Sequence, residues 1–114
     1  MAIDSIQIGP IIYKVQFVDN LHAEDGRGID GWIRYGQSTI SVDSSVGPQR
    51  ARQTIWHEVI HGLFDNAGIA QPPEGTVEAL ANGVMDVLMR NPALVDLTIG
   101  EPVIHAHKQK TKKE

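Results

Sequence analysis

The segment His57-Glu58-Val59-Ile60-His61 constrains this chain more than any other feature. It lies in a stretch of helical apolar periodicity, and two residues four positions apart on a helix share one face. Both imidazoles can therefore bind one metal ion, with Glu58 beside the ion's remaining position. A carboxylate there can take a proton from a metal-bound water. The competing interpretation is a core helix with two hydrogen-bonded histidines and no metal.

A catalytic zinc site normally uses three protein ligands and leaves one position for water. The extended motif with a third histidine six residues after His61 is excluded, because that position is Ala67. A carboxylate on the next helix is the other common arrangement, and we predict Glu78 as this ligand. The alternative for Glu78 is an exposed glutamate that favours the helix dipole. Glu74 is the weaker candidate because it lies in a segment rich in Pro and Gly, and Asp86 lies two helical turns further on.

Four further residues are candidates for supporting roles. Asn82 follows Glu78 by four positions, so its side-chain oxygen can accept the free ring N–H of a metal-binding histidine. An exposed helix asparagine is the alternative. Tyr35, Tyr13 and His22 are candidate donors to the oxyanion of an acyl-transfer reaction, and Tyr35 ranks first because it lies near a predicted hairpin. Each of these three also fits as an ordinary sheet or loop residue.

The predicted strands are β-branched or alternating segments bounded by turn residues: residues 11–18, 32–35 and 39–42. The last two are expected to pair as a hairpin across residues 36–38. The predicted helices are residues 48–67, with Pro48 in the first turn and Gly68 as the C-terminal cap, and residues 76–90, which Asn91-Pro92 ends. Gly83, inside the second helix, predicts a tight crossing of the two helices.

These elements predict an α+β fold, with a small antiparallel sheet of about three strands packed on two main helices. The first helix carries the two histidines and the second carries the third metal ligand. At 114 residues the chain is expected to form one domain, residues 1–104. Residues 105–114 carry four lysines and one glutamate, which predicts a basic, flexible tail. Nucleic-acid binding is not expected, because this basic segment is short, terminal and without aromatic residues.

The composition excludes several classes of protein. The chain has no cysteine, so it has no disulfide, no thiolate metal site and no cysteine nucleophile. No apolar run approaches the roughly 20 residues of a membrane span. The N-terminal residues do not form an export signal, and the expected location is the cytoplasm. A metal must therefore be held by histidine and carboxylate, which suits zinc.

The combination of His57-Glu58-x-x-His61 with Glu78-x-x-Ala81-Asn82, over about residues 36–92, resembles the ImmA/IrrE-type metallopeptidases. It is also similar to small phage- and prophage-encoded HExxH proteins and, in size, to the minimal gluzincins (minigluzincins). This resemblance implies a minimal zincin-like domain in a phage or bacterial protein. It implies that His57, His61 and Glu78 bind one zinc ion and that Glu58 is the general base of a cytoplasmic endopeptidase. Some members of that group cleave a transcriptional repressor, but we do not expect regulated repressor cleavage here, because residues 1–114 show no DNA-binding or sensor domain.

The predicted activity is hydrolysis of a peptide or protein substrate, with Glu58 acting first as base and then as acid. The strand 39–42 is expected to lie at the sheet edge and to bind the substrate as an added strand. Residues 101–114 could instead cover the cleft, with a histidine in the open metal position, although a free tail is the simpler expectation. The alternative function is a zinc-binding interaction module that is catalytically weak, latent or inactive. The sequence does not predict the oligomeric state.

Overall fold

The computed structural model describes residues 3–100, so the predicted tail and the segment 101–114 lie outside the described residues. Four strands and three helices follow one another along this part of the chain. They are β1 (Ser5–Ile8), β2 (Ile11–Val18), β3 (Gly31–Arg34), β4 (Thr39–Asp43), α1 (Pro48–Asn66), α2 (Glu74–Arg90) and α3 (Pro92–Ile99). The fold is α+β, as predicted.

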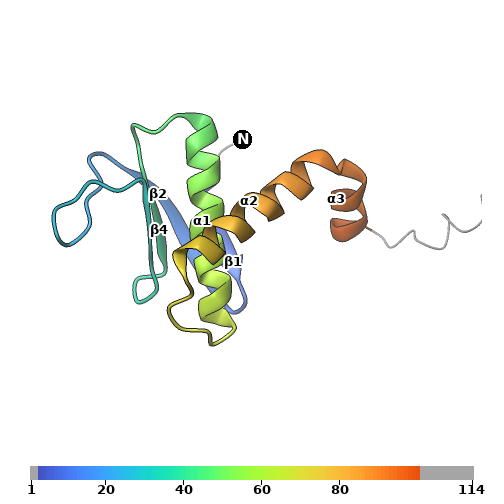
Figure 1. Cartoon of the computed structure of the whole chain (residues 1–114), viewed down its shortest axis with the longest axis horizontal. Helices are drawn as coiled ribbons and strands as arrows, with labels where there is room; N and C mark the ends of the chain where they lie inside the picture. The colour runs from blue at the N-terminus through green and yellow to red at the C-terminus, as the bar shows by residue number, and fades with distance from the viewer. Residues whose placement is uncertain (1–2, 101–114) are drawn as a thin grey trace, which may run out of the picture. The chain divides into compact units, whose positions relative to one another are not determined.

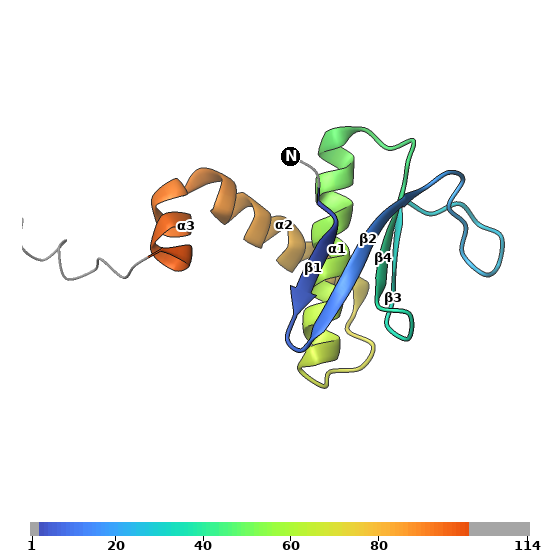
Figure 2. The same cartoon turned by 180° about the vertical axis from the view of Figure 1, so that it is seen from behind.

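The sheet contains four strands in the order β1-β2-β4-β3 (Figure 2). β3 and β4 form the predicted hairpin, with Ile33 opposite Ile40. β1, which was not predicted, forms a second hairpin with β2. β2 and β4 pair in parallel, with Val15 beside Ile40, so the sheet is mixed and the expected purely antiparallel arrangement is wrong. β4 consequently lies inside the sheet and β3 forms one edge, which also corrects the expected position of residues 39–42.

Helix α1 covers one face of this sheet (Figure 1). The core between them consists of Ile8, Tyr13, Ile33 and Ile40, with Val59 of α1 packed against it. The helix and sheet approach closely at Gly62, where an added Cβ would lie 2.6 Å from Cδ1 of Ile8. Gly62 thus lets α1 lie close to the sheet, where the helix contacts β3, β4 and β1.

The first half of α2 packs against α1 through a second apolar cluster. Val77 and Ala81 are fully buried against Ile60, and Trp56 and Phe64 border them. Gly83 lies outside this contact, because an added Cβ there would meet no atom within 4 Å. The tight crossing predicted from Gly83 is therefore wrong. Small residues do permit the helix contact, but the one that matters is Ala81.

Contacts divide the chain into two units, residues 1–83 and 84–114, with the boundary inside α2. The described part of the second unit consists of the last residues of α2 and of α3, which was not predicted. No side chain of α3 is buried. Within this unit the Asn91 amide donates to the Val87 carbonyl, and the Thr98 hydroxyl donates to the Leu94 carbonyl. None of the helices in residues 3–100 is both long and apolar enough to cross a membrane.

Candidate metal centre

His57 and His61 lie on one side of α1, as their four-residue spacing predicts, and line the same hollow as Trp32 and Ile33 of β3. Their side chains are 21% and 17% exposed, and their ring centroids are 5.0 Å apart. Both histidines lie in the second half of α1. Pro48 occupies the first turn of the helix, and the chain turns away after its end at Gly68, whose φ is +78°. A left-handed residue at this position is the usual helix exit, and glycine adopts it without strain.

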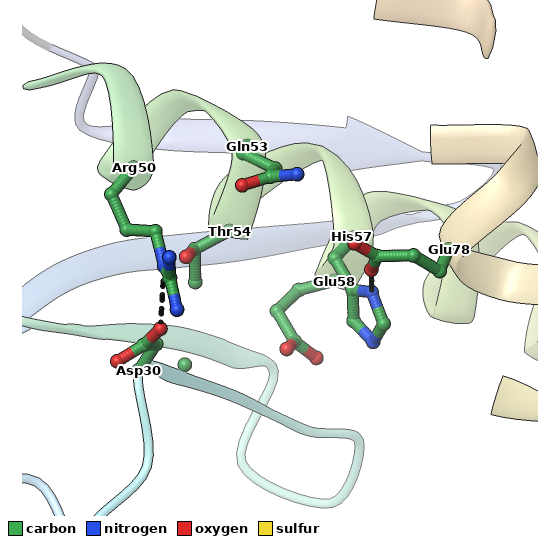
Figure 3. A pocket seen from close by; sticks show the side chains of 8 residues that line it. Asp30, Arg50, Gln53, Thr54, His57, Glu58 and Glu78 are labelled. Carbon is green, nitrogen blue, oxygen red and sulfur yellow. Dashed lines mark hydrogen bonds and ion pairs between the residues drawn. The ribbon is translucent and has the colours of Figure 1, made fainter. Parts of the chain in front are cut away.

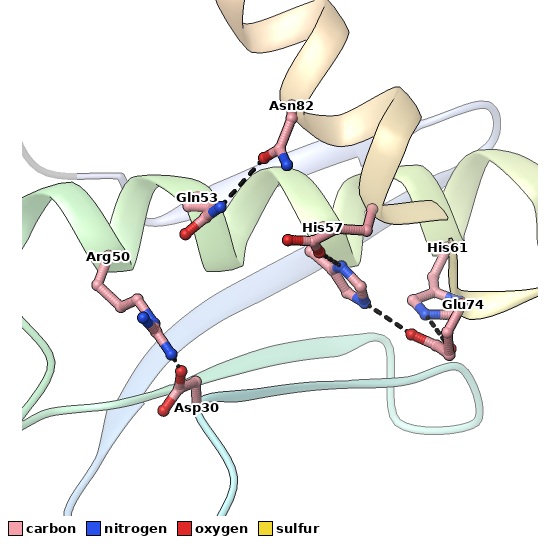
Figure 4. A network of polar contacts seen from close by, with 8 residues as sticks. Asp30, Arg50, Gln53, His57, His61, Glu74 and Asn82 are labelled. Carbon is pink, nitrogen blue, oxygen red and sulfur yellow. Dashed lines mark hydrogen bonds and ion pairs between the residues drawn. The ribbon is translucent and has the colours of Figure 1, made fainter. Parts of the chain in front are cut away.

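The carboxylate of Glu74 faces both histidines (Figure 4). Its Oε1 atom lies 3.0 Å from Nε2 of His57, and its Oε2 atom lies 3.1 Å from Nε2 of His61. These three residues form a group whose donor atoms all lie within 4.8 Å of one another. Within residues 3–100, it is the group that the structure offers for a metal ion.

The position of Glu74 follows from where α2 begins. Pro73 directly precedes the helix, and its carbonyl accepts hydrogen bonds from the Thr76 and Val77 amides. The Pro-rich segment therefore starts the helix instead of delaying it to residue 76, and Glu74 is in the first turn. Val77, three positions later, is fully buried against α1 and anchors this turn. Glu74 is thereby brought over the histidines, although we had ranked it below Glu78.

Glu78 contacts the same histidine from the other side of the ring (Figure 3). Its Oε1 atom lies 2.8 Å from Nδ1 of His57, while Glu74 faces Nε2 of that ring. Glu78 is therefore not a member of the three-residue group in which we had expected it. A carboxylate on the second ring nitrogen is the usual outer partner of a metal-binding histidine, because it fixes the tautomer and the ring orientation.

Asn82 does not take the outer-partner role that we predicted for it. Its side-chain oxygen accepts a hydrogen bond of 3.1 Å from the Gln53 side chain of α1. The bond links α1 to α2 about one turn from the histidines (Figure 4). Glu78, one helical turn earlier, is the residue of α2 that contacts Nδ1 of His57.

The three donor groups fit a zinc ion. Two imidazoles and one carboxylate are a common ligand set of zinc sites that keep one position open. Zinc bonds of about 2.0–2.1 Å would place neighbouring donors of a tetrahedral site about 3.3 Å apart. Glu74 reaches the two histidines through different oxygens, Oε1 at 3.0 Å from His57 and Oε2 at 3.1 Å from His61. One donor atom from each residue can be chosen so that all three lie within 4.8 Å of one another, so a small rearrangement of these side chains would bring them to the spacing of a metal site.

Glu58 is buried beside this group, with 7% of the residue exposed. Desolvation by burial raises the pKa of its carboxyl to about 7, although nearby His57 and a hydrogen bond from the Ile33 backbone N–H act in the opposite direction. Glu58 and His57 line two hollows on the surface, one of which is drawn in Figure 3. A group with this pKa can both hold and release a proton near neutral pH.

His61 and Tyr35 adjoin each other at the other end of the site. Burial lowers the pKa of His61, although Glu74 opposes this effect, so its ring favours the neutral form that a metal ligand requires. The Tyr35 hydroxyl donates a hydrogen bond of 3.4 Å to the His61 carbonyl. Burial, assisted by Asp65 and Glu58, raises the pKa of Tyr35 to about 12, so the hydroxyl keeps its proton.

The other two candidate oxyanion donors lie elsewhere. Tyr13 is 3% exposed and belongs to the core between the sheet and α1. His22 pairs with Gly28 across the loop that joins β2 to β3. Neither residue lines the two hollows. Of the three candidates, the structure brings only Tyr35 to the site.

The smaller of the two hollows, hollow 1, has a volume of about 380 Å³ and lies toward the start of α1, between Arg50 and Glu78. The larger, hollow 2, has a volume of about 810 Å³ and reaches from the β2–β3 loop to Tyr35 and Glu74. Both include Gly31, His57 and Glu58 in their walls. The metal-binding group and the buried carboxyl thus lie in the middle of a hollowed strip along β3.

Comparisons of this chain with protein families, with curated proteins and with solved structures found no match. The chemistry of the centre is therefore inferred from its own donor atoms and from the groups around them.

Proposed function

We propose that this chain is a zinc-dependent endopeptidase. The observation that carries the proposal is the placement of a buried carboxyl group, Glu58, beside a cluster of two histidines and a carboxylate. A helix that presents His-Glu-x-x-His needs a third ligand from another element, and Glu74 supplies a carboxylate at the right distance. In this proposal His57, His61 and Glu74 hold one zinc ion, and Glu78 orients His57.

A bound zinc ion would polarise the carbonyl of the scissile bond and lower the pKa of a coordinated water. Glu58 accepts the proton of the attacking water and later passes it to the departing amine. Its burial supports this role, because a carboxyl pKa of about 7 makes both transfers feasible near neutral pH. Its hydrogen bond from Ile33 keeps the carboxyl group on the β3 side of the site.

The substrate would bind along β3. This strand forms the sheet edge next to the site, so a peptide can extend the sheet by one strand. Hollows on both sides of His57 leave room for the chain before and after the scissile bond, which favours an endopeptidase. The sequence predicts the same mode of binding, strand addition, at residues 39–42. We now propose it for β3, because β3 and not β4 forms the edge of the sheet.

Tyr35 is the proposed donor to the oxyanion. Its hydroxyl stays protonated at neutral pH, and the residue is 42% exposed at the edge of hollow 2. Its bond to the His61 carbonyl is long at 3.4 Å, so the hydroxyl can turn toward a substrate oxygen at small cost. Oxyanion stabilisation of this kind is typically a large contribution to acyl-transfer catalysis.

The test measures the zinc content of the purified protein and its cleavage of a mixed peptide library, for the native chain and for Glu58→Gln. We expect about one zinc per chain in both proteins, and hydrolysis only in the native one. Zinc binding without hydrolysis in either protein would support the alternative, a zinc-binding interaction module. Absence of zinc binding after reconstitution would overturn the metal centre itself.

A further inference from the structure

We propose that hollow 1 selects substrates with a lysine or arginine side chain immediately after the scissile bond. This inference rests on the proposed peptidase function and assigns a specificity to one side of the same site. The proposal is supported by the lining of hollow 1, which consists mainly of residues that can accept hydrogen bonds. Its one arginine, Arg50, already forms an ion pair with Asp30.

One wall of hollow 1 is the start of α1. Arg50, Gln53, Thr54 and His57 follow one another at helical spacing and turn the same side of the helix toward the hollow. The opposite wall is Asp30 and the beginning of β3 (Figure 3). None of the lining residues has an aliphatic or aromatic hydrocarbon side chain, so a large apolar side chain would lose its hydration here without gaining apolar contact.

The charges of the lining residues favour a cation. Arg50 donates from Nε to Asp30 at 2.9 Å, and this ion pair spans the outer end of the hollow. Glu78 and Glu58 add two more carboxyl groups, so the lining of hollow 1 contains three acidic residues and one arginine. The Gln53 side-chain nitrogen donates to Asn82, which leaves its oxygen as a further acceptor. An incoming ammonium or guanidinium group would therefore find several acceptors and would not have to displace a free cation.

Hollow 2 differs from hollow 1 in its apolar surface, which gives the site a direction. Its wall carries acidic residues too, among them Glu24, Asp25 and Glu74, but Ile29, Trp32, Ile33 and Tyr35 add apolar or aromatic surface that hollow 1 lacks. Of the two hollows, only hollow 2 could therefore accommodate a large apolar side chain of a substrate that crosses both. β3 runs from Gly31 at hollow 1 toward Tyr35 at hollow 2. A peptide added antiparallel to β3 therefore enters hollow 1 with the residue that follows the scissile bond.

The test uses three quenched fluorescent peptides that are identical except for lysine, glutamate or leucine at the position after the scissile bond. The zinc-loaded native protein is expected to cleave the lysine peptide with a kcat/KM up to about fivefold above the other two, the range of an exposed ion pair. Arg50→Gln should raise the lysine-to-glutamate ratio, and Asp30→Asn should lower it, because it leaves Arg50 unpaired. Arg52→Gln is the matched control, since it removes a positive charge from the same helix outside the hollow.

Two results would overturn this inference while leaving the peptidase proposal intact. One is equal or better cleavage of the leucine peptide, and the other is an unchanged lysine-to-glutamate ratio in both hollow variants. Failure to cleave any peptide would instead count against the peptidase proposal. In that case the binding of the three peptides to zinc-loaded Glu58→Gln, measured by calorimetry, tests the preference directly. Equal affinities would refute the selectivity of hollow 1.

Discussion

Glu78 and Glu74 approach His57 from opposite ring nitrogens: Oε1 of Glu78 lies 2.8 Å from Nδ1, and Oε1 of Glu74 lies 3.0 Å from Nε2. A carboxylate can only accept a hydrogen bond. The contact with Glu78 therefore holds the ring proton on Nδ1 and leaves Nε2 for a metal ion. Nε2 is also the atom that faces His61 and Glu74. In the proposed zinc centre the two glutamates, four residues apart on α2, would thus have different roles.

This difference predicts the order of metal affinities in two matched variants. Glu74→Gln, which removes a proposed ligand, should weaken zinc binding by at least about 100-fold. Glu78→Gln, which alters only the partner of a ligand, should weaken it by roughly 10- to 100-fold. Competition with a chromophoric chelator measures both constants. The reverse order would show that Glu78 binds the metal, as we first predicted from the sequence.

Burial of Glu58 predicts the pH dependence of stability in the metal-free protein. Its folded-state pKa, about 7, lies above the ordinary value of 4.5. The stability that this group contributes is therefore fully present below pH 4.5 and is lost as pH rises through about 7. The loss could reach about 3 kcal/mol. His61, whose pKa burial lowers, acts in the opposite direction, since its contribution is lost as pH falls.

The Glu58→Gln variant separates the contribution of Glu58 to the pH dependence of stability from that of His61. Urea unfolding in the presence of a chelator should show the variant gaining stability relative to the native chain between pH 5 and pH 8. Glu24→Gln, at an exposed position of the β2–β3 loop, serves as the control and should show no such gain. Parallel pH profiles of the native chain and Glu58→Gln would contradict the prediction.

Gly31 lies where α1 and the sheet are so close together that a larger side chain should disturb their packing. A Cβ at this position would lie 2.3 Å from Cγ2 of Thr54, 3.3 Å from the Ser41 carbonyl oxygen and 3.4 Å from Oε2 of Glu58. Gly31→Ala should therefore destabilise the fold by about 1–3 kcal/mol. Combining it with Thr54→Ser removes the clashing methyl group and should restore much of the loss. Thermal unfolding of the single and double variants measures both effects.

Two glycines within helices should respond in opposite ways to alanine. Gly83 of α2 faces open space, so Gly83→Ala should stabilise the protein by up to about 1 kcal/mol through helix propensity. Gly62 of α1 is buried, with Cδ1 atoms of Ile8 and Ile33 at 2.6 and 3.3 Å from an added Cβ, so Gly62→Ala should destabilise it. Chemical denaturation of both variants tests the pair. Stabilisation by Gly62→Ala would show that Ile8 can move aside at no cost.

Local signals predicted the elements near the site well. The alternating or β-branched segments around Val15, Ile33 and Ile40 form strands, and the first helix ends at the expected glycine. Asn91-Pro92 ends the second helix as predicted, but the prediction missed the helix that follows. Pro92 occupies the first turn of α3, as Pro48 does in α1. Proline lacks an amide hydrogen that the first turn does not need, so it fits there.

The sequence by itself determined that two histidines share one face of a helix with Glu58 beside them, because helical periodicity is a local property of the chain. Only the tertiary structure decided that Glu74 faces both histidines and that Glu78 contacts Nδ1 of His57. That choice depends on how Val77 and Ala81 seat α2 against α1, and packing between distant segments is not encoded in spacing. The parallel pairing of β2 with β4, which leaves β3 at the edge, has the same origin.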